Sequence, residues 1–152
     1  MSLSNTFESD LLLLIANNTN CALIGDATGL RGSTTVGSLY VALHTADPGE
    51  AGNQSTNEIS YTGYARVAVA RTSGGWTISG TAPTQFANTG AVTFGACTAG
   101  SGTATYFSVG TDTSGTGKIL WSGAITSPGA GLAISAGITP AFAAGQLVCN
   151  ID

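Results

Sequence analysis

The stretch from Leu39 to Arg71, LYVALHTADPGEAGNQSTNEISYTGYARVAVAR, decides the fold class. It begins with a short segment in which apolar and polar positions alternate. It then passes through an acidic turn at Asp47-Pro48-Gly49 and ends in a second, longer alternating segment. A period of two is typical of a strand with one buried face, and proline and glycine mark a reversal of the chain. The stretch therefore predicts two strands joined by a polar loop of about a dozen residues.

Similar alternating segments follow along the rest of the chain, separated by turn signals such as Ser73-Gly74-Gly75 and Ser127-Pro128-Gly129. The segments expected to form strands are Leu39–Thr45, Ile59–Thr72, Trp76–Ser79, Val92–Ala96, Thr103–Thr111, Lys118–Ile125, Gly131–Ser135 and Gln146–Ile151. About eight short strands at near-regular spacing predict an all-β protein. The expected architecture is a jelly-roll-like antiparallel β-sandwich.

The N-terminal residues have a helical pattern instead. Asn5 is the expected N-cap, and Glu8, three residues later, would complete a capping box. Asn17 and Asn18 are expected to end the helix. The residues that share one apolar face at helical spacing are Phe7, Leu11, Leu14 and Ile15.

Leu12 and Leu13 widen this apolar face beyond what a solvated helix needs, so we expect them to contact the same chain or a partner. Residues 1–36 are therefore expected to form a short α-helix and a Gly/Thr-rich arm. Residues 37–152 are expected to form the β-sandwich, within a single domain.

The composition excludes several classes of protein. The chain has 152 residues, a net charge of -4 and 8% charged residues, against roughly 25% in typical domains. Four basic residues spread over the chain make no basic stripe, so no nucleic-acid partner is expected. The longest apolar run, Leu11–Ala16, is too short to span a bilayer, so no membrane partner is expected. So little charge predicts a surface that is largely covered by protein partners.

Three cysteines, Cys21, Cys97 and Cys149, are spaced too far apart for a zinc knuckle or a redox pair. We expect them to be free thiols buried as small hydrophobic side chains. This use of cysteine fits synthesis in a reducing cytoplasm.

The only histidine lies in the pattern His44-x-x-Asp47-x-x-Glu50, which could ligate a metal. Pro48-Gly49 breaks any helix that would bring these side chains together, so the pattern is better explained by the solvated acidic end of a hairpin. His44 is also the only possible base for a hydrolase, and no serine lies in a G-x-S-x-G motif. We therefore expect no catalytic residue, no metal and no cofactor.

Several aromatic side chains could stack on a sugar ring or anchor a protein interface, namely Tyr40, Tyr64, Trp76, Tyr106 and Trp121. The interpretation we favour for each is that it fills a gap in a core of small residues. Arg66 and Arg71 are isolated in an uncharged sheet. We expect them to pair with Glu58 or with a carboxylate of a partner.

The order of these segments resembles a known family. At LYVALHTADPGEAG, followed by Glu58 and by residues 60–66, SYTGYAR, the chain is similar to small structural proteins of tailed bacteriophages that are often labelled phage tail fibre proteins. The similarity continues through residues 92–94, 106–110, 117–123 and 137–147. Residues 21–36 depart from the family pattern as a Gly-Thr-rich insertion, which we expect to be a partner-binding arm.

This resemblance implies a non-enzymatic virion protein and carries no catalytic residues. Our first expectation is a capsid decoration (cement) protein on the capsid exterior, bound to the major capsid protein and to itself as a dimer or trimer. The alternative is a tail-fibre or baseplate module that binds host surface glycans, and a hydrolase built on His44 comes third. The residues expected to contact partners are Tyr40, His44, Asp47, Glu50, Tyr64, Arg66, Leu12 and Leu13.

Overall fold

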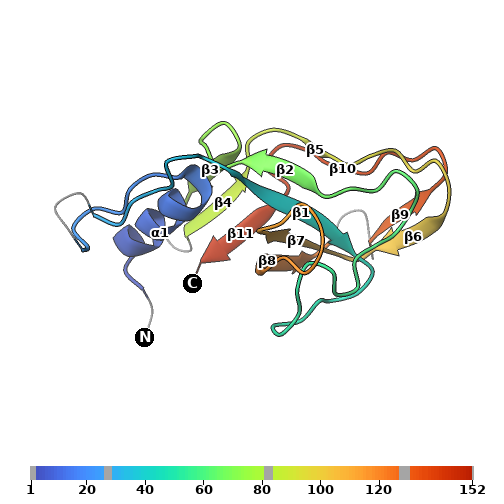
Figure 1. Cartoon of the computed structure of the whole chain (residues 1–152), viewed down its shortest axis with the longest axis horizontal. Coiled ribbons are helices and arrows are strands. Elements are labelled where there is room, and N and C mark those ends of the chain that lie inside the picture. Colours follow the sequence, from blue (N-terminus) through green and yellow to red (C-terminus); the bar gives the residue numbers. More distant parts are fainter. Residues whose placement is uncertain (1–2, 26–28, 81–83, 127–130, 152) are drawn as a thin grey trace. The chain divides into compact units, whose positions relative to one another are not determined.

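The computed structural model describes residues 3–25, 29–80, 84–126 and 131–151. These residues form one helix and eleven strands (Figure 1). The elements are α1 (Asn5–Asn17), β1 (Ser38–His44), β2 (Val67–Ala70), β3 (Trp76–Ser79), β4 (Thr84–Asn88), β5 (Val92–Thr93), β6 (Ser101–Ala104), β7 (Tyr106–Gly110), β8 (Ile119–Ala124), β9 (Leu132–Ser135), β10 (Ala141–Phe142) and β11 (Val148–Ile151). The predicted class, an all-β sandwich-like fold of antiparallel sheets with a short N-terminal helix, is confirmed.

The chain divides into two compact units. Unit 1 takes its described residues from Met1–Ser38, Val69–Ala91 and Ala143–Asp152, and unit 2 takes them from Leu39–Ala68 and Val92–Phe142. The expected end of the N-terminal arm at residue 36 lies close to the first crossing between the units. Unit 1 also takes described residues from Val69–Ala91 and Ala143–Asp152, which are predicted to belong to the sandwich.

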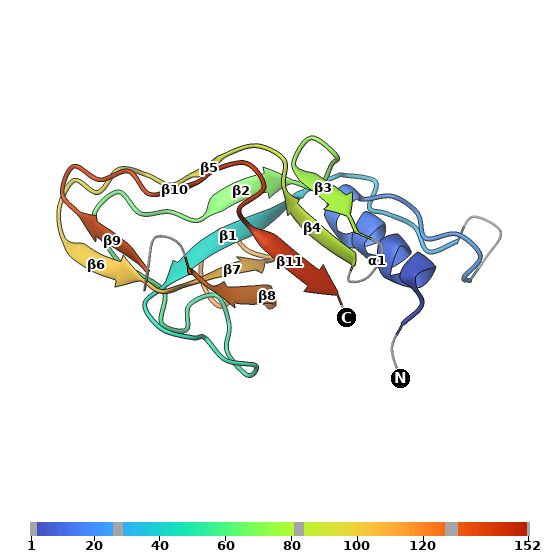
Figure 2. The same cartoon turned by 180° about the vertical axis from the view of Figure 1, so that it is seen from behind.

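Unit 1 is a three-stranded antiparallel sheet, in the order β11-β4-β3, with α1 packed against β3 and β4 (Figure 2). Its core contains Leu12 and Ala16 of the helix with Trp76 and Phe86 of the sheet, all fully buried. The rings of Trp76 and Phe86 meet edge to face, with 5.0 Å between their centroids. Such aromatic pairs add to the free energy gained by burying apolar surface.

The start and the buried face of α1 differ from the sequence prediction. The N-cap is Ser4, whose Oγ accepts a hydrogen bond from the Phe7 amide, and Asn5 is the first helical residue. Glu8 is therefore one position too late for a capping box, and its buried carboxylate accepts a hydrogen bond of 3.0 Å from Thr84 Oγ1. The C-terminal end is as predicted, because Asn18 adopts the left-handed conformation that closes a helix.

Leu12 lies at the centre of the buried helix face, between Glu8 and Ala16, and Leu13 is half-buried. The expected face through Phe7, Leu11, Leu14 and Ile15 is only partly buried. The reason is the i, i+4, i+8 spacing of Glu8, Leu12 and Ala16, which aligns these three residues on the sheet.

Unit 2 contains β1, β7 and β8 of an antiparallel sheet with the order β2-β1-β7-β8, and two smaller sheets, β10-β5 and β6-β9. The register places Val41 opposite Val109 and Leu43 opposite Phe107. A chain of ring contacts at centroid distances of 5.4 to 6.2 Å joins Tyr61 to Tyr64, Tyr64 to Phe94, Phe94 to Phe142 and Phe142 to Phe107. This aromatic cluster is part of the core of unit 2, together with aliphatic side chains such as Val41, Leu43 and Val109.

The predicted strand Ile59–Thr72 is much shorter than expected, because only Val67–Ala70 forms a strand. Gly63 interrupts the pattern with a φ of +104°, and a Cβ there would lie 2.2 Å from the carbonyl oxygen of Ala96. A side chain does not fit this close approach, so the chain turns here instead of continuing as a strand. The short strands β4 and β10 were missed, since each carries too little alternation to stand out.

The three cysteines are free and buried, as predicted. Cys21 and Cys149 belong to unit 1, and Cys97 belongs to unit 2. Burial raises the pKa of the Cys149 thiol to about 12, so this side chain stays protonated at neutral pH.

Arg71 ties the end of α1 to the rest of unit 1. Its Nε donates to the carbonyl oxygen of Ile15 at 2.6 Å, and its Nη2 donates to that of Leu14 at 2.8 Å. These carbonyls lie in the last turn of the helix, where they lack partners within the helix and where the helix dipole is negative. The expectation that Arg71 pairs with a carboxylate is therefore replaced by a cationic cap on the helix.

We expect Arg71→Met to lower the free energy of unfolding by about 1.5–3 kcal/mol, because two charged hydrogen bonds to the helix end are lost. Hydrogen exchange should show faster exchange in the last turn of α1, and chemical denaturation should give the change in stability. Arg71→Lys keeps the charge without the two-pronged geometry, so its free energy of unfolding should lie between those of the wild type and Arg71→Met. Unchanged exchange in Arg71→Met would contradict the capping role.

Candidate functional site

The polar loop after β1, residues 45–57, is held by a series of side-chain to backbone hydrogen bonds. Asp47 Oδ1 accepts from the Gly49 amide at 2.9 Å, and Asn53 Oδ1 accepts from the Ser55 amide at 2.9 Å. Asn57 Nδ2 donates to the Asp47 carbonyl at 3.0 Å, which joins the two ends of the loop. The loop expected from the acidic Pro-Gly turn is therefore a set of successive tight turns.

His44 lies at the base of this loop and is fully buried. Its Nδ1 lies 2.8 Å from the carbonyl oxygen of Thr56, and its Nε2 lies 2.8 Å from Ser108 Oγ. A carbonyl can only accept, so Nδ1 carries the proton, and in the neutral ring Nε2 accepts from the Ser108 hydroxyl. Burial lowers the pKa of His44, although the Thr56 carbonyl and the Glu58 charge act in the opposite direction.

Gln54 is a second fully buried polar side chain in the loop, which sequence reasoning missed. Its Nε2 donates to the Tyr40 carbonyl at 3.0 Å, and its Oε1 accepts from the Asp112 amide at 3.0 Å. A Cβ at Gly110 would lie 2.2 Å from Gln54 Cδ, and one at Gly117 would lie 2.4 Å from Oε1. The only signal in the sequence was the pair of glycines that make room for the amide.

An ion pair between the buried Arg66 and the partly exposed Glu58 joins the end of the loop to the segment before β2. Arg66 Nε donates to Glu58 Oε1 and its Nη2 donates to Oε2, both at 2.7 Å, with the Arg66 side chain only 2% exposed. The hydrogen bond to Glu58 raises the pKa of Arg66 further. The predicted pairing of Arg66 with Glu58 is confirmed as a two-pronged contact.

Arg66 and Glu58 also hold other segments. Arg66 Nη1 donates to the Asp112 carbonyl at 3.0 Å, and Nη2 donates to the Gly115 carbonyl at 2.7 Å. The Tyr64 hydroxyl donates to Glu58 Oε1 at 2.9 Å and accepts from the Leu43 amide at 3.1 Å. Burial is the main cause that raises the pKa of Tyr64. The ion pair thus connects β1, the polar loop and the segment between β7 and β8.

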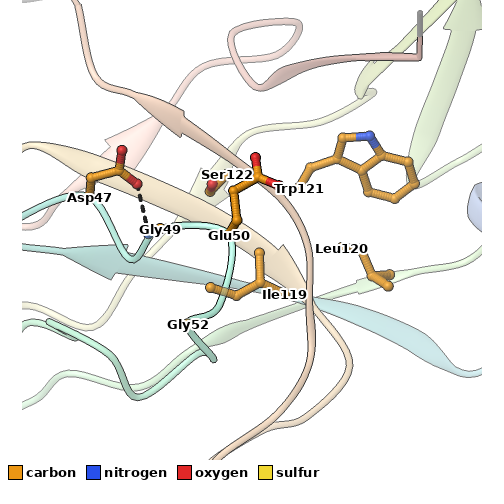
Figure 3. A pocket seen from close by; sticks show the side chains of 8 residues that line it. All are labelled: Asp47, Gly49, Glu50, Gly52, Ile119, Leu120, Trp121 and Ser122. Carbon is orange, nitrogen blue, oxygen red and sulfur yellow. Dashed lines mark hydrogen bonds between the residues drawn. The ribbon is translucent and has the colours of Figure 1, made fainter.

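Two surface cavities flank this network within unit 2. The first has a volume of about 430 Å³ and lies between the tip of the polar loop and β8 (Figure 3). Its lining residues are Asp47, Gly49, Glu50, Gly52, Ile119, Leu120, Trp121 and Ser122. In Figure 3 the Glu50 side chain rises from the loop, and Asp47 is bonded back to Gly49.

The second cavity, of about 400 Å³, lies over the ion pair. It is lined by Glu58, Ile59, Ser60, Tyr64, Ala65, Arg66, Thr113, Ser114 and Gly115. The Arg66 and Glu58 side chains in this lining already bond to each other. Their charges are therefore neutralised and are not available to bind a charged ligand.

The structure divides the eight residues that were expected to contact partners. Asp47 and Glu50 are exposed, and Tyr40, Tyr64 and Leu13 are half-buried. His44, Arg66 and Leu12 are buried in the folded chain, and for Leu12 this is the expected contact with the same chain. His44 and Arg66 are in the interior because each has buried hydrogen-bond partners, and Leu12 because it packs in the core of unit 1. Whether any of the eight touches a partner stays a prediction.

The aromatic candidates divide in a similar way. Trp76 is fully buried in unit 1, so it cannot stack on a ligand. Tyr64 has its hydroxyl bonded to Glu58 and its ring stacked on Phe94. Tyr40, Tyr106 and Trp121 are half-buried. The preferred interpretation of these aromatic residues as core is therefore confirmed for Trp76, whereas Tyr64 is half-buried and lines the second cavity.

The contact between His44 and Ser108 does not have the geometry of a hydrolase. Nδ1 of His44 bonds to a backbone carbonyl, where a catalytic triad places a carboxylate, and Ser108 is fully buried. Among residues 3–25, 29–80, 84–126 and 131–151, no three His, Cys, Asp or Glu side chains come together as metal ligands. Within the same ranges, no helix has the length and hydropathy to cross a bilayer.

We expect Glu58→Gln to lower the free energy of unfolding by about 3–5 kcal/mol, because it leaves the buried Arg66 cation without its carboxylate. Chemical denaturation measures the change. The matched control is Glu50→Gln, which makes the same change at an exposed position and should shift stability by no more than about 0.5 kcal/mol. Similar losses in both variants would refute the structural role of the pair.

We also expect stability to fall as the pH drops below the ordinary pKa of histidine, 6.5. The unfolded chain takes up a proton at His44 in this range while the folded protein does not, so protonation favours unfolding; above this range the group has no effect. Denaturation between about pH 7 and pH 5 tests this, with His44→Gln as the comparison. The variant should show a flatter pH dependence, and equal slopes would exclude His44 as the cause.

Comparison with known proteins identifies one family. Residues 4–150 match the family model described as Podophage GP4 fiber I protein gp80. No curated protein and no solved structure gives a significant match. The matched region includes the helix, the polar loop and both cavities, and the expected relationship to tailed-phage structural proteins is confirmed. The chain therefore belongs to the family of the podophage GP4 fiber I protein gp80, a family of phage virion structural proteins.

Proposed function

We propose that this phage virion structural protein is part of the tail-fibre assembly and that its arm, residues 21–36, docks into an apolar groove of a neighbouring virion protein. The family description favours the fibre over the capsid shell. The observation that carries the docking role is Leu23, whose side chain is fully exposed and whose φ is +65°.

Both the exposure and the backbone conformation of Leu23 are unfavourable for the stability of the isolated chain. An exposed leucine gains nothing from the hydrophobic effect, and a branched side chain is rarely found in the left-handed conformation, which asparagine, aspartate and glycine adopt more easily. A residue that costs stability without making contacts is best explained by a contact with another molecule. Burial of Leu23 on docking supplies the missing gain.

The surroundings of Leu23 are also apolar. Of the seven large hydrophobic side chains that are exposed in the described part of the chain, Leu23, Ile24, Leu30 and Val36 lie in the arm. Such grouping of exposed apolar residues is typical of protein interaction sites.

The arm is held in place by the end of the helix. Asn18 Nδ2 donates to the Ser33 carbonyl at 2.8 Å, and its Oδ1 accepts from the Ser33 amide at 2.6 Å. Cys21 and Leu30 exchange two backbone hydrogen bonds of 2.8 and 2.9 Å. A Cβ at Gly32 would lie 2.2 Å from the Asn18 carbonyl oxygen, so glycine is needed there. The apolar side chains are therefore presented from an anchored segment, which reduces the entropy lost on binding.

A capsid decoration protein that binds the major capsid protein on the capsid exterior is the competing proposal. This proposal fits the low charge of the chain equally well. It predicts many more copies of the protein per particle than the fibre proposal does. Host-glycan binding has less support, because Trp76 is in the core and both the hydroxyl and the ring of Tyr64 are engaged.

Quantitative mass spectrometry of purified virions tests the proposal. We expect a few copies per particle, and Leu23→Asp should reduce the number of copies while leaving the unfolding midpoint unchanged, because aspartate tolerates a positive φ. The matched control is Ile138→Asp in unit 2, which places the same charge on another exposed apolar residue and should incorporate normally.

Copies comparable in number to the capsid subunits would overturn the fibre assignment in favour of decoration. Normal incorporation of Leu23→Asp would overturn the docking role of the arm, whatever the copy number.

A further inference from the structure

We infer that the cavity between the polar loop and β8 binds an arginine side chain that a segment of a partner protein presents. The cavity lies within unit 2, and its volume of about 430 Å³ is in the range of natural ligand pockets. The arm lies in unit 1, so the inference does not depend on the docking role proposed for the arm.

The charged side chains of the cavity are acidic. Asp47 and Glu50 line its loop side, and both are exposed. Within the described part of the chain, none of the eight lining residues is basic, and Lys118, which immediately precedes β8, is not part of the lining. Two carboxylates on one side of a cavity attract a cation and repel an anion. The charge of the cavity therefore selects a basic group on the partner.

The β8 side of the cavity is apolar. It includes Ile119, Leu120 and Trp121, each partly exposed. In Figure 3 the side chains of Leu120 and Trp121 lie away from Asp47, on the far side of Glu50. Arginine has an apolar stem and a planar cationic end, so it can cover this apolar side while it donates to both carboxylates. A small inorganic cation would leave the apolar side uncovered.

The edge of β8 favours a single inserted side chain over a partner strand. Val109 pairs with Trp121 and Gly110 pairs with Ile119, so Leu120 is an extra residue in β8. Such a bulge disrupts the ladder and bends the strand, which keeps another strand from pairing along this edge. Bulges are frequent beside functional sites, where they change the direction of a side chain. A partner can therefore reach the cavity with one projecting side chain.

The two sides of the cavity are held together within the chain itself. The backbone amide of Gln54 donates to the Gly117 carbonyl at 2.8 Å, and Ser55 Oγ donates to the Gly115 carbonyl at 2.7 Å. These bonds join the loop to the segment that leads into β8. Asp47 Oδ1 accepts from the Gly49 amide, which fixes the direction of this carboxylate. A site that is already formed loses little conformational entropy when it binds a partner.

NMR titration of the isotope-labelled full chain tests the inference, with the peptide acetyl-Gly-Arg-Gly-amide as the probe. We expect shifts of the amide signals of the loop tip and of β8, and weaker binding at higher salt, because the contact is ionic. Asp47→Asn and Glu50→Gln should each weaken binding about fivefold or more, because each removes a carboxylate that accepts from the guanidinium. Asparagine at position 47 can still accept from the Gly49 amide, so the turn is kept.

Two controls separate the charge of the probe from its shape and the site from the net charge. Acetyl-Gly-citrulline-Gly-amide has nearly the shape of the arginine peptide without its charge and should not bind measurably. Asp10→Asn removes a carboxylate from α1 in unit 1 and should leave the affinity unchanged.

Three results would each overturn the inference: equal shifts with both peptides, no shift of these signals up to the solubility limit of the arginine peptide, or the same loss of affinity in Asp10→Asn as in Glu50→Gln. Shifts of the same signals when the protein concentration alone is raised would also overturn it, because the occupant would then be a second copy of the chain.

Discussion

The ion pair between Arg66 and Glu58 is the contact on which the organisation of unit 2 depends. One guanidinium bonds to both carboxylate oxygens and to two backbone carbonyls of the segment between β7 and β8. The same carboxylate accepts from Tyr64, which also bonds to the β1 backbone. β1, the end of the polar loop and the segment between β7 and β8 are thereby fixed around one charged centre, which also lines the second cavity.

The small number of charged residues has a structural explanation. Two of the four basic side chains, Arg66 and Arg71, act as internal connectors, one for the polar loop of unit 2 and one for the helix end of unit 1. Arginine suits both positions because its planar group donates several hydrogen bonds in fixed directions and stays charged when buried. Few charges are left to make the surface soluble.

The fold class could be predicted from the sequence because alternation and turn chemistry are local signals. Leu39–Thr45 and Trp76–Ser79 correspond closely to β1 and β3. The break at Gly63 could not be predicted, since it depends on the approach of Ala96, a residue distant in the sequence. The same applies to His44 and Gln54. Their buried positions depend on the partners Ser108, Asp112 and Tyr40, which only become neighbours after folding. Charge pairing was easier to predict, because few basic residues were available to neutralise Glu58.

The free thiols described above have a consequence for how the two units can be followed. Unit 1 contains Cys21 and Cys149, unit 2 contains Cys97, and all three are enclosed in the folded protein. A thiol that is enclosed reacts with a reagent only when its surroundings open. Cys21 lies at the base of the arm, in the bridge to Leu30, and Cys97 lies in unit 2. Each unit therefore contains at least one buried thiol whose rate of reaction with a thiol reagent reports how often that unit opens. The opening of either unit can be measured in this way without adding a label.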